Sequence, residues 1–287
     1  MIAIRRGATV FALALALVVL GAGACSQGTP SEQGDGVGTP SDAGVGDATS
    51  PGTDLHAPKS DTSNAGGDWL GQPDVAPGVT LGEPVSGQFH LGPVEWEGSF
   101  WNSCAPYPAA IQTAEGELLA GLGLDYNGEG QLCDACILVQ TAKGKQAVLR
   151  VVTTGTTNQP GDIDVSSAAY ALLDSGEYPR TMTWRLVACT TAGTVQYQFQ
   201  TGAHQWWSSF WVRNARLPIA KVEVKSANHS DWFALRRGSD GTWTDDGGFG
   251  AGSFTLRVTA TTGAALQDTF DGFTGGDLLT SPTGQFP

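Results

Sequence analysis

The stretch His204-Gln-Trp-Trp-Ser-Ser-Phe-Trp-Val-Arg-Asn214 joins a pair of tryptophans to a strand-like alternation. Residues 208–213 alternate in a way that predicts a strand with Trp211 on one face and Phe210 on the other. Period-2 burial accommodates one large apolar side chain per two residues, so Trp206 and Trp207 cannot both point into one core. An indole outside the core needs a flat partner, such as a sugar ring. The stretch therefore predicts either a carbohydrate-binding face or part of a large β core.

Short alternating runs bounded by Gly or Asn surround this stretch. They cover residues 195–199, 220–224, 232–235 and 253–258. This spacing is typical of a β-sandwich of roughly 100 residues, which we place at residues 192–287.

The region before the sandwich has a different pattern, with strand-like runs separated by Gly-rich turns. The clearest runs are 94–101, 136–140, 146–152 and 181–187. One helix is predicted, with Asp164 or Ser166 as its N-cap and Gly176 beyond its end. We therefore expect a small closed barrel at residues 86–191 and a mainly β protein.

The first 25 residues have the features of a signal peptide. Arg5 and Arg6 precede an apolar run from Thr9 to Leu20 that is short for a membrane span. Small residues then lead directly into Cys25, as in a bacterial lipobox, which predicts lipidation of Cys25. Ordinary cleavage and secretion is the alternative. Either route places the mature chain outside the cytoplasm, anchored by lipid at the cell surface or outer membrane, or secreted.

Residues 26–85 are predicted to form a disordered acidic linker rich in Gly, Ser, Thr and Pro. The segment has few large apolar side chains, so burial cannot offset the entropy of ordering it. The whole chain carries a formal net charge of −13, which argues against nucleic acid as a partner. We expect a neutral ligand and a monomer, with no membrane contact beyond a lipid at Cys25.

Four cysteines follow Cys25: Cys104, Cys133, Cys136 and Cys189. The Cys133-x-x-Cys136 spacing could serve a metal, but a zinc site would need a second close pair or nearby histidines. In an exported chain two disulfides are expected instead, and spacing alone leaves all three pairings open. We expect no metal and no cofactor.

The order of motifs resembles that of a microbial expansin. The similarity covers about residues 90–287 and includes a terminal Gln285-Phe-Pro287. The motifs are Gly98-Ser-Phe-Trp-Asn-Ser-Cys104, Cys133-Asp-Ala-Cys136, Gly161-Asp-Ile-Asp164-Val-Ser, Thr183-Trp-Arg-Leu-Val-Ala-Cys189, Trp206-Trp207 with Val212-Arg213-Asn214, Trp232-x-x-Leu235 and Gly250-Ala-Gly-Ser253.

The resemblance implies a six-stranded double-psi β-barrel followed by an immunoglobulin-like β-sandwich that binds carbohydrate. It implies loosening of cellulose or related β-glucans without hydrolysis. It also implies the disulfides Cys104–Cys133 and Cys136–Cys189.

Asp164 matches the aspartate that expansins place in the barrel groove; in the related family-45 endoglucanases a similar aspartate is the general acid. Its alternative role is to cap the predicted helix. Glycoside hydrolysis needs two carboxylates, and the family's Thr-Tyr-x-Gly stretch reads Glu95-Trp-Glu97-Gly98 here. Glu95 or Glu97 on one strand face could therefore pair with Asp164, with Trp96 as a sugar platform. Asp162 is expected to be solvated in a loop.

The sequence leaves three functions open: a non-hydrolytic expansin, a β-glucan hydrolase or lytic transglycosylase that uses Asp164, and a pure carbohydrate-binding protein with a degenerate groove. In the sandwich, Trp206 and Trp207 match the aromatic pair that expansins stack on glucan. The family's third aromatic falls on Ser239 or Asp240, and Trp211 is a possible substitute.

Overall fold

The computed structural model describes residues 80–97, 104–155 and 159–286. The predicted signal peptide, Cys25 with its lipidation, most of the predicted linker, and residues 98–103 of the first expansin-like motif lie outside the described residues. Within the described part of the chain, no helix is long and apolar enough to span a bilayer.

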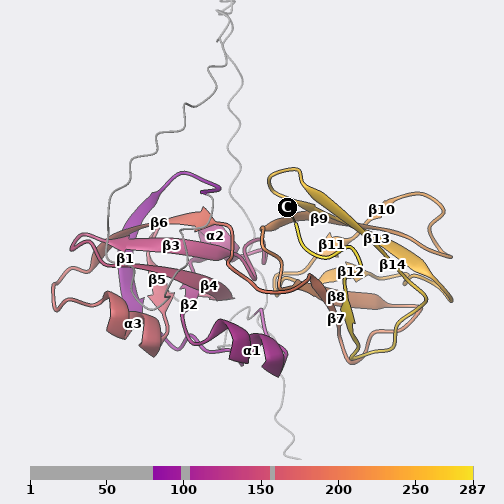
Figure 1. Ribbon diagram of the computed structural model, residues 1–287, viewed down its shortest axis with the longest axis horizontal. Helices are drawn as coiled ribbons and strands as arrows, with labels where there is room; N and C mark the ends of the chain where they lie inside the picture. Colours follow the sequence, from indigo (N-terminus) through magenta and orange to yellow (C-terminus); the bar gives the residue numbers. More distant parts are fainter. Residues whose placement is uncertain (1–79, 98–103, 156–158, 287) are drawn as a thin grey trace, which may run out of the picture. The chain divides into compact units, whose positions relative to one another are not determined.

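Six strands close into a barrel in the order β1-β5-β2-β4-β3-β6 (Figure 1). They are Val85–Leu91 (β1), Leu119–Leu122 (β2), Cys136–Thr141 (β3), Gln146–Thr154 (β4), Ile163–Val165 (β5) and Thr181–Val187 (β6). The β1–β5 and β2–β4 pairs are parallel, and the other neighbours are antiparallel. Apolar side chains such as Phe89, Leu149 and Ile163 fill the interior. The prediction of a mainly β fold with a six-stranded barrel is confirmed.

In the described residues three short helices accompany the barrel: Ala109–Glu115 (α1), Leu124–Asn127 (α2) and Ser167–Leu173 (α3). Only α3 was predicted. Its N-cap is Ser166, whose hydroxyl accepts from the backbone N–H of Ala169, so Asp164 in β5 is not the cap. The four residues of α2 are too few to leave a helical periodicity in the sequence. α1 is as long as α3 but lacks the side-chain N-cap that marks the start of α3.

The strand predicted at residues 94–101 is wrong in its described part. The first strand is β1, which ends at Leu91, and residues 96–97 form a turn. Pro93, two residues after Leu91, has no N–H to donate to a strand ladder. At Gly92 the chain also passes so close to Asp164 that a Cβ there would lie 2.6 Å from the aspartate Cβ.

Two further sheets pack face to face (Figure 1). One has the order β10-β9-β13-β14 and the other β11-β12-β8-β7-β15. The strands are Gln196–Phe199 (β7), Ser208–Arg213 (β8), Ile219–Lys225 (β9), Phe233–Ala234 (β10), Arg236–Arg237 (β11), Trp243–Asp245 (β12), Phe254–Ala260 (β13), Ala265–Phe270 (β14) and Leu278–Thr280 (β15). A cluster of phenylalanines, Phe199, Phe210, Phe249 and Phe254 among them, forms the core between the sheets.

Strand β8 is buried along both faces. Phe210 points into the sandwich core, on the face opposite Trp211. On the opposite face, the guanidinium of Arg213 reaches the barrel segment around Asp134. It pairs with the Asp134 carboxylate at 2.6 Å and donates to the carbonyl oxygens of Cys104 at 2.7 Å and Pro106 at 2.8 Å. Its carbon also lies 4.0 Å from the ring centroid of Tyr107.

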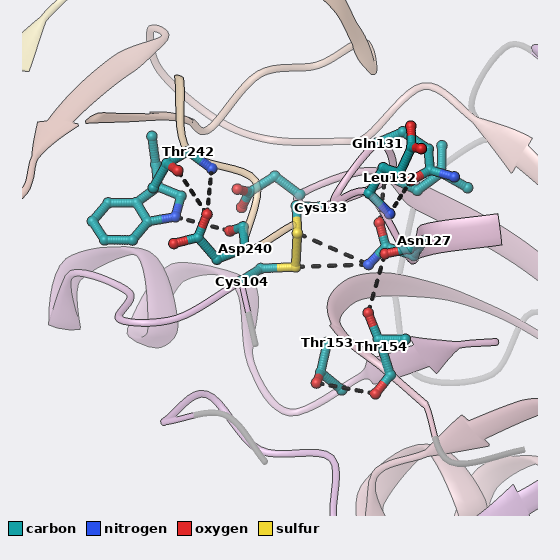
Figure 2. The surroundings of a disulfide bond; sticks show 12 residues. Cys104, Asn127, Gln131, Leu132, Cys133, Thr153, Thr154, Asp240 and Thr242 are labelled. Carbon is teal, nitrogen blue, oxygen red and sulfur yellow. Dashed lines mark hydrogen bonds between the residues drawn. A yellow bond between two sulfur atoms is a disulfide. The ribbon is translucent and has the colours of Figure 1, made fainter. Parts of the chain in front are cut away.

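The four cysteines form the disulfides Cys104–Cys133 and Cys136–Cys189, the pairing that the resemblance implied. Figure 2 shows the first bond, with the amide of Asn127 on one side of it. The 238–242 loop of the sandwich packs against it, since a Cβ on Gly241 would lie 2.6 Å from the Cys133 Cβ. Barrel and sandwich are thus joined beside a covalent cross-link.

Candidate functional site

Trp206 lies in a tight two-residue turn that presents its indole to solvent. His204 and Trp207 exchange backbone hydrogen bonds of 2.9 Å on either side of the turn. The Nδ1 atom of His204 accepts from the backbone N–H of Trp206 at 3.2 Å. The side chain is among the most exposed large apolar groups in the described residues, with 61% of its surface accessible. The turn fixes the backbone of an exposed aromatic group.

Two glycines pack against the backbone of this turn. A Cβ on Gly248 would lie 2.3 Å from the carbonyl oxygen of Gln205, and Gly248 has a φ of +72°. The N–H of Gly250 donates to the same Gln205 oxygen at 2.8 Å. A side chain at Gly248 would push the turn away, so glycine is needed for this close approach. These contacts hold the backbone at Gln205 and Trp206 in place.

Trp207 is half-buried and packs against the sandwich core. The possible platform at Trp211 is wrong. Its side chain is 5% exposed, its Nε1–H donates to the carbonyl oxygen of Asp240 at 3.0 Å, and Arg213 lies 5.0 Å from its ring. Because polar and charged neighbours cover this face of β8, the ring cannot stack on a ligand.

Ser239 and Asp240, where the resemblance places the third aromatic residue of expansins, lie in a loop that is held by internal hydrogen bonds. One carboxylate oxygen of Asp240 accepts from the backbone N–H and the hydroxyl of Thr242. Trp243 nearby is a core residue. Of the predicted pair, Trp206 is exposed and Trp207 is half-buried.

In the barrel, Asp164 points away from the core, because Ile163 and Val165 on either side of it point inward. Its side chain is bordered by two glycines. A Cβ on Gly92 would lie 2.6 Å from the Asp164 Cβ, and one on Gly155 would lie 3.0 Å from Oδ2. Glycine at both positions lets the backbone pass this close to the Asp164 side chain, which is 5% exposed.

The residue paired with Asp164 on β1 is His90. The Nε2 atom of His90 lies 3.0 Å from Oδ2 of Asp162, and the backbone N–H of Gln88 donates to Oδ1 of Asp162 at 2.8 Å. The expectation that Asp162 is solvated in a loop is wrong, since its side chain is 8% exposed. The sequence did not single out His90 as a site residue. The alternation around Phe89 places His90 and Phe89 on different faces of a strand, but it does not show which strand pairs with it.

Glu95 and Glu97 are exposed and lie outside any strand, so the prediction that they share a strand face is wrong. The sugar platform predicted at Trp96 is also wrong. Trp96 is 3% exposed, packs edge-to-face on Tyr107 at 4.9 Å, and donates from Nε1 to the carbonyl oxygen of Gly116 at 3.0 Å. The pairing of either glutamate with Asp164 stays a prediction.

Comparison with known proteins shows what this arrangement is similar to. No family model matches the sequence. Expansin-YoaJ of Bacillus subtilis (strain 168) is 26% identical over 148 residues, which are 51% of this chain and 62% of that protein. Expansin-like protein 3 of Dictyostelium discoideum is 24% identical over 149 residues, which are 49% of this chain and 43% of that protein. The match thus spans less than two thirds of either relative.

Solved structures agree on the fold. The apo expansin of Clavibacter michiganensis superposes with a TM-score of 0.59 at 19% identity, covering 71% of this chain and 98% of that one. A mutant of the same expansin in complex with cellohexaose gives 0.58 at 18% identity, with the same coverages. The chain is expansin-like in sequence and in fold.

Proposed function

We propose that this expansin-like chain binds cellulose or a related neutral β-glucan and loosens it without hydrolysis. The exposed indole of Trp206 on its supported turn is the observation that carries the proposal. An aromatic ring held by a fixed backbone loses little conformational freedom on binding and offers a flat apolar face to a sugar ring. Trp207 extends that face. A relative's structure with cellohexaose supports an oligosaccharide ligand.

The barrel supplies the second part of the proposed site. Asp164 faces away from the barrel core, beside Gly92 and Gly155, and is the carboxylate that we propose contacts hydroxyl groups of a glucan. Hydrolysis would need a second carboxylate at a defined separation. Asp162 already accepts hydrogen bonds from Gln88 and His90, so its carboxylate is engaged in holding β5 against β1. This favours a non-hydrolytic role.

The proposed site also fits a location outside the cytoplasm. Two disulfides are typical of oxidising compartments. We propose that residues 1–25 export the chain, that Cys25 carries a lipid, that residues 26–85 act as an acidic tether, and that residues 86–191 and 192–287 act together as a monomer on the polymer.

The test compares wild type with the Trp206→Ala/Trp207→Ala double variant in a pull-down on microcrystalline cellulose. We expect retention to fall by about tenfold, equivalent to about 1.4 kcal/mol. Tyr178→Ala is the matched control, because Tyr178 is an aromatic residue of the barrel that is 85% exposed. Unchanged retention of the double variant would refute the binding face.

Activity needs separate measurements. Wild type should weaken cellulose paper, and Asp164→Asn should not, while neither releases reducing sugar from soluble β-glucan. Release that is lost in Asp164→Asn would establish a hydrolase or a lytic enzyme instead. Equal weakening by both proteins would show that loosening does not depend on Asp164, and weakening by neither would leave a pure carbohydrate-binding role.

A further inference from the structure

A second surface, lined by both polar and apolar groups, lies on the outside of the barrel, next to the Asp164 region. It is a groove of about 720 Å³ over strands β1, β3 and β6. Its outward side chains form rows across the strands. Ser86 pairs with Thr183, and Thr183 pairs with Gln140. Cross-strand partners at this spacing of about 5 Å act as one continuous surface.

A second row joins this groove to the proposed site. Thr181 pairs with Gln88, and the backbone N–H of Gln88 donates to Asp162, which also lines the groove. Asp162 in turn contacts His90, the strand partner of Asp164. The outward residues thus run without interruption from Gln140 to Asp164.

A close backbone approach shapes the groove at this junction. A Cβ on Gly87 would lie 2.3 Å from the carbonyl oxygen of Gly161, and one on Gly161 would lie 2.2 Å from that of Ser86. Gly161 has a φ of +85°, and its carbonyl oxygen accepts from Nε1 of the buried Trp184 at 2.9 Å. The two glycines let β5 lie directly against β1, which brings the Asp162 carboxylate to the groove.

The chemistry of the lining selects an uncharged ligand with many hydroxyl groups. Hydroxyl and carboxamide side chains both donate and accept, as the hydroxyl groups of a sugar do. The lining contains no lysine or arginine, and its carboxylate Asp162 would repel an anion.

We propose that this groove is a further subsite for a neutral glucan, and that one chain bound over Asp164 continues across His90 into the row Ser86, Thr183 and Gln140. The inference rests on the proposed function and deepens it. The groove's lining contains no aromatic residue, so it aligns the chain through hydrogen bonds, while Trp206 and Trp207 supply the stacking affinity.

The experiment removes the stacking face first. In the full chain carrying Trp206→Ala/Trp207→Ala, cellohexaose is titrated and the backbone amide shifts of Ser86, Gln140 and Thr183 are followed by NMR. Saturable shifts at these amides are expected. Adding Thr183→Lys, which places a long side chain in the middle of the row, should weaken the fitted affinity at least fivefold.

Thr259→Lys is the matched control, because Thr259 is a half-buried strand threonine in β13, and it should leave the affinity unchanged. If Thr183→Lys does not fold, the double variant Ser86→Ala/Gln140→Ala, at two exposed positions, replaces it. It should also weaken the fitted affinity for cellohexaose. Equal affinity with and without the groove substitutions, or no shift at the groove amides, overturns the subsite. If such a result is found while Trp206→Ala still binds cellulose more weakly than wild type, only the subsite is refuted. If wild type binds neither cellohexaose nor cellulose, the proposed function is refuted as well.

Discussion

Trp206 and Trp211 lie five residues apart in one stretch of chain, yet 61% of one side chain is exposed and 5% of the other. Trp206 is in a turn supported by Gly248 and Gly250. Trp211 is in a strand whose outer face is closed by the Asp240 loop and by Arg213. The same residue type is our proposed binding group at one end of the stretch and a packing group at the other. What covers a tryptophan decides its role.

Replacing Arg213 should have the largest effect on stability, because Arg213 is a buried charged residue beside Trp211. Arg213→Ala leaves the Asp134 carboxylate without its partner and is expected to lower the free energy of unfolding by about 3–5 kcal/mol. Chemical denaturation measures this. Arg216→Ala, an exposed arginine three residues away, should change it by less than about 0.5 kcal/mol.

The double variant Arg213→Ala/Asp134→Ala should regain part of that loss, because it also removes the buried carboxylate. Equal stability of Arg213→Ala and wild type would show that the ion pair does not hold the two parts together.

The two tryptophans should then separate binding from stability. Trp206→Ala alone should weaken cellulose binding by about fivefold, equivalent to about 1 kcal/mol, and leave the free energy of unfolding unchanged within about 0.5 kcal/mol. Trp211→Phe should do the reverse. It loses the hydrogen bond to Asp240 and about 1 kcal/mol of stability, while the folded protein binds normally. Pull-down and denaturation of both variants make the contrast, and weaker binding by folded Trp211→Phe would contradict it.

An ion pair on the open face of the sandwich should have the smallest effect. Burial raises the pKa of Glu223, but hydrogen bonds from Lys221 and Arg257 outweigh it and place the pKa below its ordinary value. Stability from this carboxylate is therefore present above pH 4.5, the ordinary value, and is lost as the pH falls through the lower pKa of the folded state.

Glu223→Gln should reduce the loss of stability on acidification by less than about 1 kcal/mol. Denaturation midpoints between neutral and acidic pH, compared for wild type and variant, measure it. A pH dependence identical in the two proteins would show that Glu223 contributes nothing.

Local patterns in the sequence were enough for several features. Alternation alone predicted which residues of β8 share a face, because a strand's side chains alternate whatever its neighbours are, but it did not show that the Phe210 face is the core. The motif order pointed to the barrel, the sandwich and the disulfide pairing, which the spacing of the cysteines had left open.

Long-range contacts decided the rest. His90 lies beside Asp164 because β1 and β5, more than 70 residues apart in the chain, pair in parallel with this register. Trp96 is buried because Tyr107 and Gly116 fold over it. A sequence fixes which side chains share a strand face, since that depends on neighbouring residues; which segment covers the face depends on contacts that no local period encodes.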